Sequence, residues 1–132
     1  MSRYRLYDYL DLNGVNDFAG WSRSQEKPDL ARLKRKLKML EDNGPDLGPK
    51  LLAGPIRRYA HIYKLIINGR VALRPLLCKG PIDNEREFTL LKGACERDWK
   101  WVPSDAPEVA RERRQEIIDD HERRCEHVAV SQ

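Results

Sequence analysis

The sequence lacks long apolar runs, and its cysteines are few. No stretch of the 132 residues approaches the roughly 18 to 20 consecutive apolar residues that cross a bilayer. The N-terminal segment MSRYRLYDYLDL has no apolar region of the signal-peptide type, so we expect a cytoplasmic protein without membrane association. Cys78, Cys95 and Cys125 are odd in number and widely spaced, which favours reduced thiols over a disulfide framework.

Other absences exclude enzyme classes. The segment GPDLGPK lacks the spacing and the Lys-Ser/Thr pair of a nucleotide-binding loop. His121, Cys125 and His127 lie close together on or just past an expected helix, and the first two share a face. A fourth ligand is not evident, so we expect no metal and no small-molecule cofactor. His61 is the only histidine outside the C-terminal segment, and no nucleophile turn accompanies it.

Acidic residues are missing from one part of the chain. Lys and Arg outnumber Asp and Glu only by 25 to 21 overall, but residues 50–80 contain no acidic residue at all. This segment predicts a local positive field, made by Lys50, Arg57, Arg58, Lys64, Arg70, Arg74 and Lys79.

The N-terminal third predicts a strand and two helices. Alternating polarity predicts a strand over Tyr4–Leu10, and Asn16 is placed to cap a short helix over residues 17–23. A second helix begins near Pro28, carries a leucine every three or four residues, and ends at Gly44-Pro45. Its cationic opposite face suits a solvated surface or a contact with nucleic acid or an acidic partner.

A β-hairpin is predicted around Asn68-Gly69. This dipeptide is typical of a two-residue type I′ turn between strands 61–67 and 70–77, which would place Tyr63 opposite Arg74. A longer turn would change that assignment, and Pro75 favours a bulge or an edge position near Arg74. A strand over residues 87–94 and a helix over residues 107–125 follow.

The order β-α-α-β-β-β-α predicts an α+β fold. We expect a small, curved antiparallel sheet with helices on one face and the opposite face open. The chain is expected to form a single domain over residues 1–126, followed by a flexible tail over residues 127–132.

Basic and aromatic residues suggest a chemistry. Arginine binds phosphate oxygens in a bidentate manner, lysine supplies a point charge, and both stabilise the negative charge that develops when a 2′-hydroxyl attacks phosphorus. Aromatic rings can stack on unpaired bases, although Trp99 and Trp101 are also explained by packing over the core. The candidates are Lys64, Arg70, Arg74, Lys92, Arg97 and Lys100, with Tyr63, Trp99 and Trp101.

From Tyr4 to about Arg114 the chain resembles the RelE/HigB superfamily of type II toxin-antitoxin toxins, in particular its phage-derived HigB-like branch. The resemblance rests on YDYLDLNGVNDF, LEDNGPDLG, LLAGPI, IYKLIINGRVALRPLL, FTLLKGA and ERDWKWVP. It implies a RelE-like fold, a metal-independent mRNA interferase that acts on ribosome-bound mRNA, and a helix-turn-helix antitoxin partner.

The resemblance also implies site residues. Arg74 matches a strand arginine that holds the scissile phosphate, Arg97 and Lys100 match basic positions after the last strand, and Lys92 stands where many relatives have histidine. With these four as catalytic candidates, the RNA-binding candidates are Arg57, Arg58, Lys64, Arg70 and Trp99. Ile66 replaces a usual arginine, so a non-catalytic RNA- or protein-binding module of phage origin is the alternative.

Overall fold

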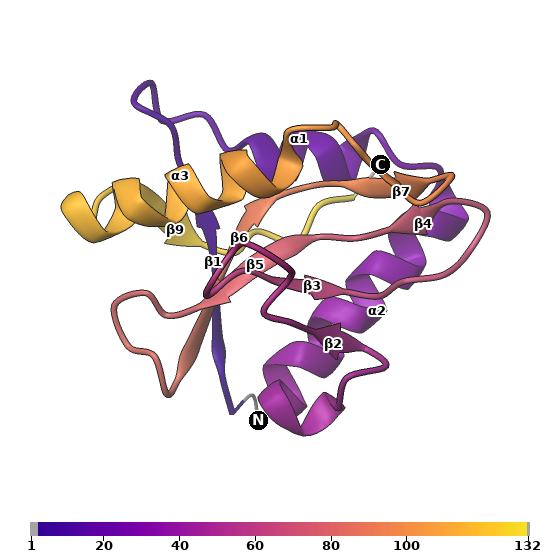
Figure 1. Cartoon of the computed structure of the whole chain (residues 1–132), viewed down its shortest axis with the longest axis horizontal. Helices are drawn as coiled ribbons and strands as arrows, with labels where there is room; N and C mark the ends of the chain where they lie inside the picture. Colours follow the sequence, from indigo (N-terminus) through magenta and orange to yellow (C-terminus); the bar gives the residue numbers. More distant parts are fainter. Residues whose placement is uncertain (1–2, 132) are drawn as a thin grey trace.

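The computed structural model describes residues 3–131, which form three helices and a mixed β-sheet. The main sheet has the order β2-β3-β5-β6-β1-β9, and a second sheet has the order β4-β7-β8 (Figure 1). The strands are β1 (Arg5–Tyr9), β2 (Leu52–Ala53), β3 (Tyr63–Leu65), β4 (Ala72–Leu73), β5 (Leu76–Lys79), β6 (Glu87–Lys92), β7 (Cys95–Arg97), β8 (Lys100–Val102) and β9 (Arg124–Glu126). The predicted α+β class is confirmed.

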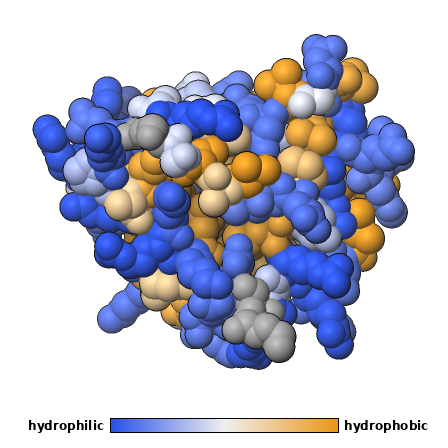
Figure 2. Space-filling model, turned by 180° about the vertical axis from the view of Figure 1, so that it is seen from behind, coloured by the Kyte–Doolittle hydropathy of each residue, from blue (hydrophilic) through white to orange (hydrophobic). Residues whose placement is uncertain are grey.

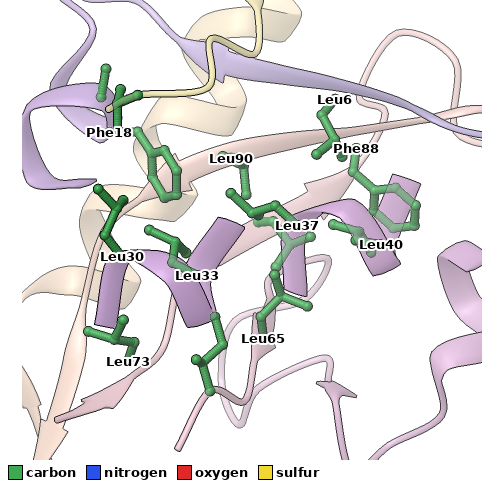
Figure 3. Close-up of a cluster of buried hydrophobic side chains, with 14 of the residues drawn as sticks. Leu6, Phe18, Leu30, Leu33, Leu37, Leu40, Leu65, Leu73, Phe88 and Leu90 are labelled. Atoms are coloured by element: carbon green, nitrogen blue, oxygen red, sulfur yellow. The ribbon is translucent and has the colours of Figure 1, made fainter. Parts of the chain in front are cut away.

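The two N-terminal helices lie where the sequence predicts them. Helix α1 spans Asp17–Arg23, and its Asn16 cap accepts a hydrogen bond from the Ala19 amide at 3.0 Å. Helix α2 spans Lys27–Asn43 and is followed by a short 3-10 helix, η1, at Gly44–Leu47. The leucines of α2 are buried against the sheet together with Phe18, Phe88 and Leu90 (Figure 3).

Both faces of the main sheet are covered, so the prediction of an open face is wrong. Helix α3 (Ala106–Asp119) and helix α2 are separated by the strands (Figure 1). Leu77 of β5 belongs to the core under α2, whereas its neighbours Leu76 and Cys78 pack with Ala110 and Ile117 of α3. Burial raises the pKa of the Cys78 thiol to about 12, and all three cysteines are free.

The sheet is mixed, which corrects the prediction of an antiparallel sheet. Strands β3, β5 and β6 form the expected antiparallel meander, but β1 pairs with β6 in parallel. A parallel pair needs a long crossover connection, which α1, α2 and the intervening strands supply. The predicted meander is therefore joined to the N-terminal strand by the parallel pairing of β6 with β1.

The last predicted helix is too long. Helix α3 ends at Asp119, where two consecutive acidic residues are unfavourable at the negative end of the helix dipole. Residues 124–126 form β9, which pairs with β1. Within the predicted flexible tail, the His127 ring nitrogen Nδ1 lies 2.8 Å from the buried Asp8 carboxylate, and Val130 is buried in the core under α2.

The hairpin turn is longer than predicted. Ile67 pairs with Leu73, and Tyr63 pairs with Leu77 rather than with Arg74. Neither Asn68 nor Gly69 has the positive φ of a type I′ turn. Gly69 instead allows the loop to approach α2, because a Cβ atom there would lie 2.8 Å from an Arg32 guanidinium nitrogen.

The surface opposite to the view of Figure 1 is mainly hydrophilic, with an apolar band across its middle (Figure 2). The predicted cationic side of α2 includes Lys34, Arg35 and Lys38, which are exposed. Lys38 forms ion pairs with Glu41 and Asp42 on the same helix. These intrahelical pairs are typical of a solvated helix face.

Candidate functional site

Three charged side chains meet where the two sheets adjoin. One Glu96 oxygen, Oε1, lies 3.0 Å from Lys64 Nζ and 3.2 Å from Arg74 Nε. Lys64 comes from β3, Glu96 from β7, and Arg74 from the break between β4 and β5. The exposed fractions of these side chains are 26%, 21% and 11%, so water screens the interactions less than on an open surface. We call Lys64, Arg74 and Glu96 the charge cluster.

Arg74 is fixed by its backbone and by its guanidinium. Pro75 interrupts the strand, and the Arg74 amide donates to the Ala94 carbonyl at 2.7 Å. The guanidinium also donates to the Leu73 carbonyl at 2.8 Å and to Asn68 Oδ1 at 2.9 Å. The predicted irregularity near Pro75 is confirmed, and it turns Arg74 towards Glu96 instead of leaving it in a regular ladder.

An open cavity of about 350 Å³ lies beside the charge cluster. Lys64 Nζ is 5.4 Å from the centre of the Trp101 ring, so the lysine borders both the cavity and the cluster. The Tyr59 hydroxyl donates to Glu108 Oε1 at 3.2 Å and fixes the rim against α3. The volume suits one small organic group or nucleotide. The lining residues are Ala53, Gly54, Pro55, Ile56, Arg57, Tyr59, Lys64 and Trp101.

The β7–β8 hairpin presents a tryptophan to solvent. Asp98 and Trp99 occupy its two-residue turn with φ values of 52° and 65°, and Arg97 pairs with Lys100 across the strands. Positive φ is unfavourable for a bulky residue. The Trp99 side chain is 98% exposed, so the packing explanation of this residue is wrong. Trp101 is half-buried against the core under α3, which agrees with that explanation for the second tryptophan.

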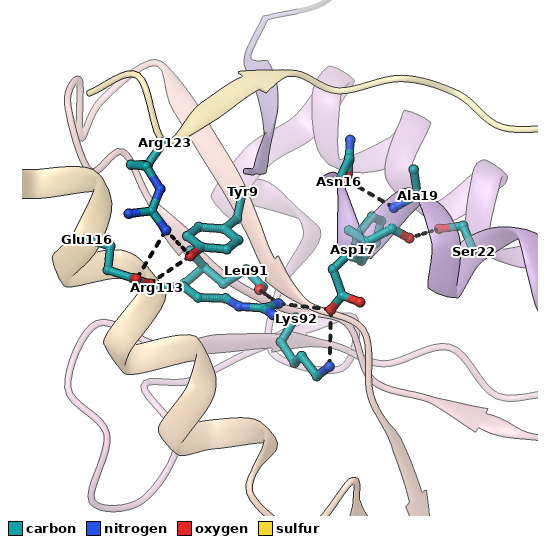
Figure 4. A network of polar contacts seen from close by, with 11 residues as sticks. Tyr9, Asn16, Asp17, Ala19, Ser22, Leu91, Lys92, Arg113, Glu116 and Arg123 are labelled. Carbon is teal, nitrogen blue, oxygen red and sulfur yellow. Dashed lines mark hydrogen bonds and ion pairs between the residues drawn. The ribbon is translucent and has the colours of Figure 1, made fainter. Parts of the chain in front are cut away.

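Lys92 does not contact the charge cluster and forms its ion pair with another carboxylate. Its ammonium group is 3.2 Å from Asp17 Oδ2, which also accepts a hydrogen bond from Arg113 at 3.0 Å (Figure 4). Burial tends to raise the pKa of Asp17, but the hydrogen bonds from Arg113 and Lys92 outweigh it and lower this pKa. Lys92 therefore links α1 to the sheet.

A second part of the same network joins α3 to β1. The Tyr9 hydroxyl donates to Glu116 Oε2 at 2.8 Å and accepts from Arg123 at 2.6 Å (Figure 4). Burial, followed by the hydrogen bond to Glu116, raises the pKa of Tyr9. Tyr9, Glu116 and Arg123 are thus hydrogen-bonded to one another.

Replacing Asp17 with asparagine should lower the free energy of unfolding by about 1 kcal/mol at pH 7, because two ion pairs are lost. The folded-state pKa of Asp17 is below the unfolded value, so the carboxylate stabilises the protein above its unfolded pKa of about 4. This contribution disappears as the pH falls through the folded pKa. Urea unfolding between pH 7 and pH 3 should show the two proteins converging; a constant difference would contradict this explanation.

The remaining predicted cations are exposed. Arg70 forms an ion pair with Glu26 at 3.3 Å, on the side of the loop that faces α2. Arg57 lines the cavity, and the neighbouring Arg58 has a φ of 73°. The structure thus places Arg57, Lys64 and Arg74 around the cavity and cluster, whereas Arg70 and Lys92 have carboxylate partners elsewhere.

Glu96 is the functional candidate that sequence reasoning missed. It interrupts a basic segment, and nothing local in the sequence marks it as part of a site. Its position opposite Ala72 across β4 and β7 depends on long-range pairing. The available signal was a pair of acidic residues, Glu96 and Asp98, among basic ones.

Comparisons with protein-family models, curated proteins and solved structures found no match for this chain. Within residues 3–131, no helix has the length and apolarity needed to cross a membrane. The same range contains no cluster of three or more His, Cys, Asp or Glu side chains arranged to hold a metal ion. Cys125 lies in β9 with its sulfur 3.7 Å from Asn16 Nδ2, whereas His121 is exposed beyond the end of α3.

Proposed function

We propose that this protein is a RelE/HigB-like mRNA interferase, the toxin of a type II toxin-antitoxin pair, which cleaves ribosome-bound mRNA and is neutralised by a helix-turn-helix antitoxin. The observation that carries the proposal is the position of Glu96 between Lys64 and Arg74, beside a cavity lined by aromatic residues. The resemblance of the sequence motifs supports the RelE-like assignment. RNA binding is supported further by Arg57 at the cavity and by the exposed hairpin turn.

The cluster suits cleavage by the RNA's own 2′-hydroxyl. In the proposed reaction Glu96 accepts the hydroxyl proton, and the 2′-oxygen forms a bond to the adjacent phosphorus. Lys64 and Arg74 stabilise the added negative charge. The bond from phosphorus to the 5′-oxygen then breaks, and this oxygen takes a proton from Lys64 or water. The products are a 2′,3′-cyclic phosphate and a 5′-hydroxyl end, and the reaction needs no metal.

The direct test is cleavage of mRNA on translating ribosomes, followed by analysis of the product ends. We expect cyclic phosphate on the upstream product and a 5′-hydroxyl on the downstream product, and loss of cleavage when the cognate antitoxin is added. Products ending in 5′-phosphate, or no cleavage with either free or ribosome-bound mRNA, would overturn the proposed reaction.

A binding module without nuclease activity is the second candidate. It is favoured by the hydrogen bonds of the Arg74 guanidinium, because a side chain already bonded to Glu96, Asn68 and Leu73 has little freedom to bind phosphate. This candidate predicts salt-dependent binding of single-stranded RNA by the exposed residues Arg57, Arg58, Arg97, Lys100 and Trp99 without strand scission.

Replacing Trp99 with alanine should weaken binding of single-stranded RNA by about 5- to 150-fold, which corresponds to loss of one stacked base at roughly 1 to 3 kcal/mol. The side chain is almost fully exposed, so the unfolding midpoint should not fall. Fluorescence anisotropy with a labelled RNA measures the effect, and Trp99→Phe is the control that retains stacking. Equal affinity of the wild-type and alanine proteins would exclude this role.

A further inference from the structure

A second, smaller cavity lies where β3 begins and β5 ends, next to α3. Its volume is about 160 Å³, and its lining residues are His61, Tyr63, Lys79, Asn84 and Arg114. None of these residues lines the cavity beside the charge cluster. The set includes two permanent cations and three other side chains that can donate hydrogen bonds, but no carboxylate.

The cations of this cavity differ from those of the proposed nuclease site. Among residues 3–131, neither Lys79 nor Arg114 forms an ion pair with a carboxylate, whereas Lys64, Arg74 and the adjacent Arg113 each do. Arg114 Nε is buried without a hydrogen-bond partner within that range. A buried donor without an acceptor is unusual in folded proteins, and here it belongs to a guanidinium that borders a cavity.

The two cations reach the cavity from different elements of the fold. Lys79 ends β5, and its ammonium group lies 5.3 Å from the centre of the Tyr63 ring. Arg114 projects from α3, so the two charges come from separate elements of secondary structure. His61 and Asn84 come from the loops before β3 and before β6. Four different segments therefore contribute to one positively charged pocket.

We propose that this pocket binds a phosphate-type oxyanion. Arginine supplies planar donors, lysine a mobile point charge, and the His61 and Asn84 side chains further donors, which together match the several acceptor oxygens of a phosphate group. The volume suits the anionic group itself, with any organic part projecting outwards. The phosphate group comes either from a free phosphate or phosphomonoester, or from the backbone of RNA. The proposal does not depend on the nuclease activity proposed above.

Isothermal titration with inorganic phosphate at constant ionic strength tests the pocket. We expect saturable binding by the wild-type protein and at least a tenfold loss of affinity in Lys79→Gln and in Arg114→Gln. Arg35→Gln is the matched control, because Arg35 is exposed on α2 and should leave affinity unchanged. If Arg114→Gln does not fold, the phosphate affinity of Lys79→Gln alone tests the proposal, because this substitution leaves α3 unchanged. Absence of saturable binding, or equal affinity in all variants, would overturn the proposal.

Competition experiments identify the source of the phosphate. A nucleoside 5′-monophosphate should displace inorganic phosphate, and the corresponding nucleoside should not. Displacement by a dinucleotide with only an internal phosphodiester would support an RNA backbone phosphate, whereas displacement by the monophosphate alone would support a free phosphomonoester. Equal displacement by the nucleoside would show that the phosphate group is not what the pocket recognises.

Discussion

Replacing Glu96 with glutamine is expected to reduce mRNA cleavage by about 10²- to 10⁴-fold, the usual contribution of a general base. Glutamine keeps the shape of the side chain and an acceptor for Lys64 and Arg74, but it cannot take the 2′-hydroxyl proton. The substitution also removes a negative charge beside the expected phosphate. RNA affinity should therefore rise while cleavage falls, and these opposite changes distinguish a lost base from a damaged binding site.

The matched control is Glu26→Gln, because Glu26, just before α2, also forms an ion pair with an arginine, Arg70, but its side chain is 68% exposed. Its cleavage rate should equal that of the wild type. Single-turnover cleavage and RNA affinity are to be measured on the same preparations. If Glu96→Gln cleaves at the wild-type rate, Glu96 is not the base, and if neither the wild type nor the variant cleaves, the binding module remains.

Local patterns predicted the helices because the reasons for those helices are local. The leucine spacing of α2 and the Asn16 cap of α1 depend only on neighbouring residues, and both elements occur where expected. The antiparallel meander of β3, β5 and β6 was also predictable, since the connections between its strands are short. The α+β class follows from these elements.

Long-range pairing explains what was missed. The parallel pairing of β1 with β6 joins residues about 80 positions apart, as in Leu6 with Phe88, and no local pattern specifies it. Strand β9 is likewise defined by its pairing with β1. The type I′ preference of Asn68-Gly69 was overridden because the loop packs against α2, while Asp98 and Trp99 adopt positive φ without the usual glycine.

The site was predictable in residue type but not in arrangement. The basic composition of residues 50–80 indicated Lys64 and Arg74 as candidate cations, but the assumed hairpin put them on opposite faces, whereas both contact Glu96. The assumed two-residue turn shifted the register, because Tyr63 pairs with Leu77 and not with Arg74. Lys92 was grouped with these cations for its charge and by the resemblance, and its contact with Asp17 comes from the packing of α1 on the sheet.

Arg74→Ala is expected to destabilise the protein by roughly 1–3 kcal/mol, because buried acceptors lose their donor while Glu96 keeps Lys64 as its partner. Two further acceptors, the Leu73 carbonyl and Asn68 Oδ1, lose their donor, and the hairpin loop loses its attachment. Urea unfolding monitored by circular dichroism measures the loss. A reduced cleavage rate in this variant alone would therefore not show that Arg74 binds phosphate.

Two further variants separate the structural role of Arg74 from its proposed chemical role. Arg70→Ala removes a side chain that is 74% exposed and should change stability by less than about 0.5 kcal/mol. Arg74→Lys keeps the charge near Glu96 but loses the planar donors, so it should recover part of the stability. If Arg74→Ala unfolds at the same urea concentration as the wild type, the structural role of Arg74 is contradicted. If Arg74→Lys folds and binds RNA normally but cleaves much more slowly, the guanidinium contributes to the reaction itself.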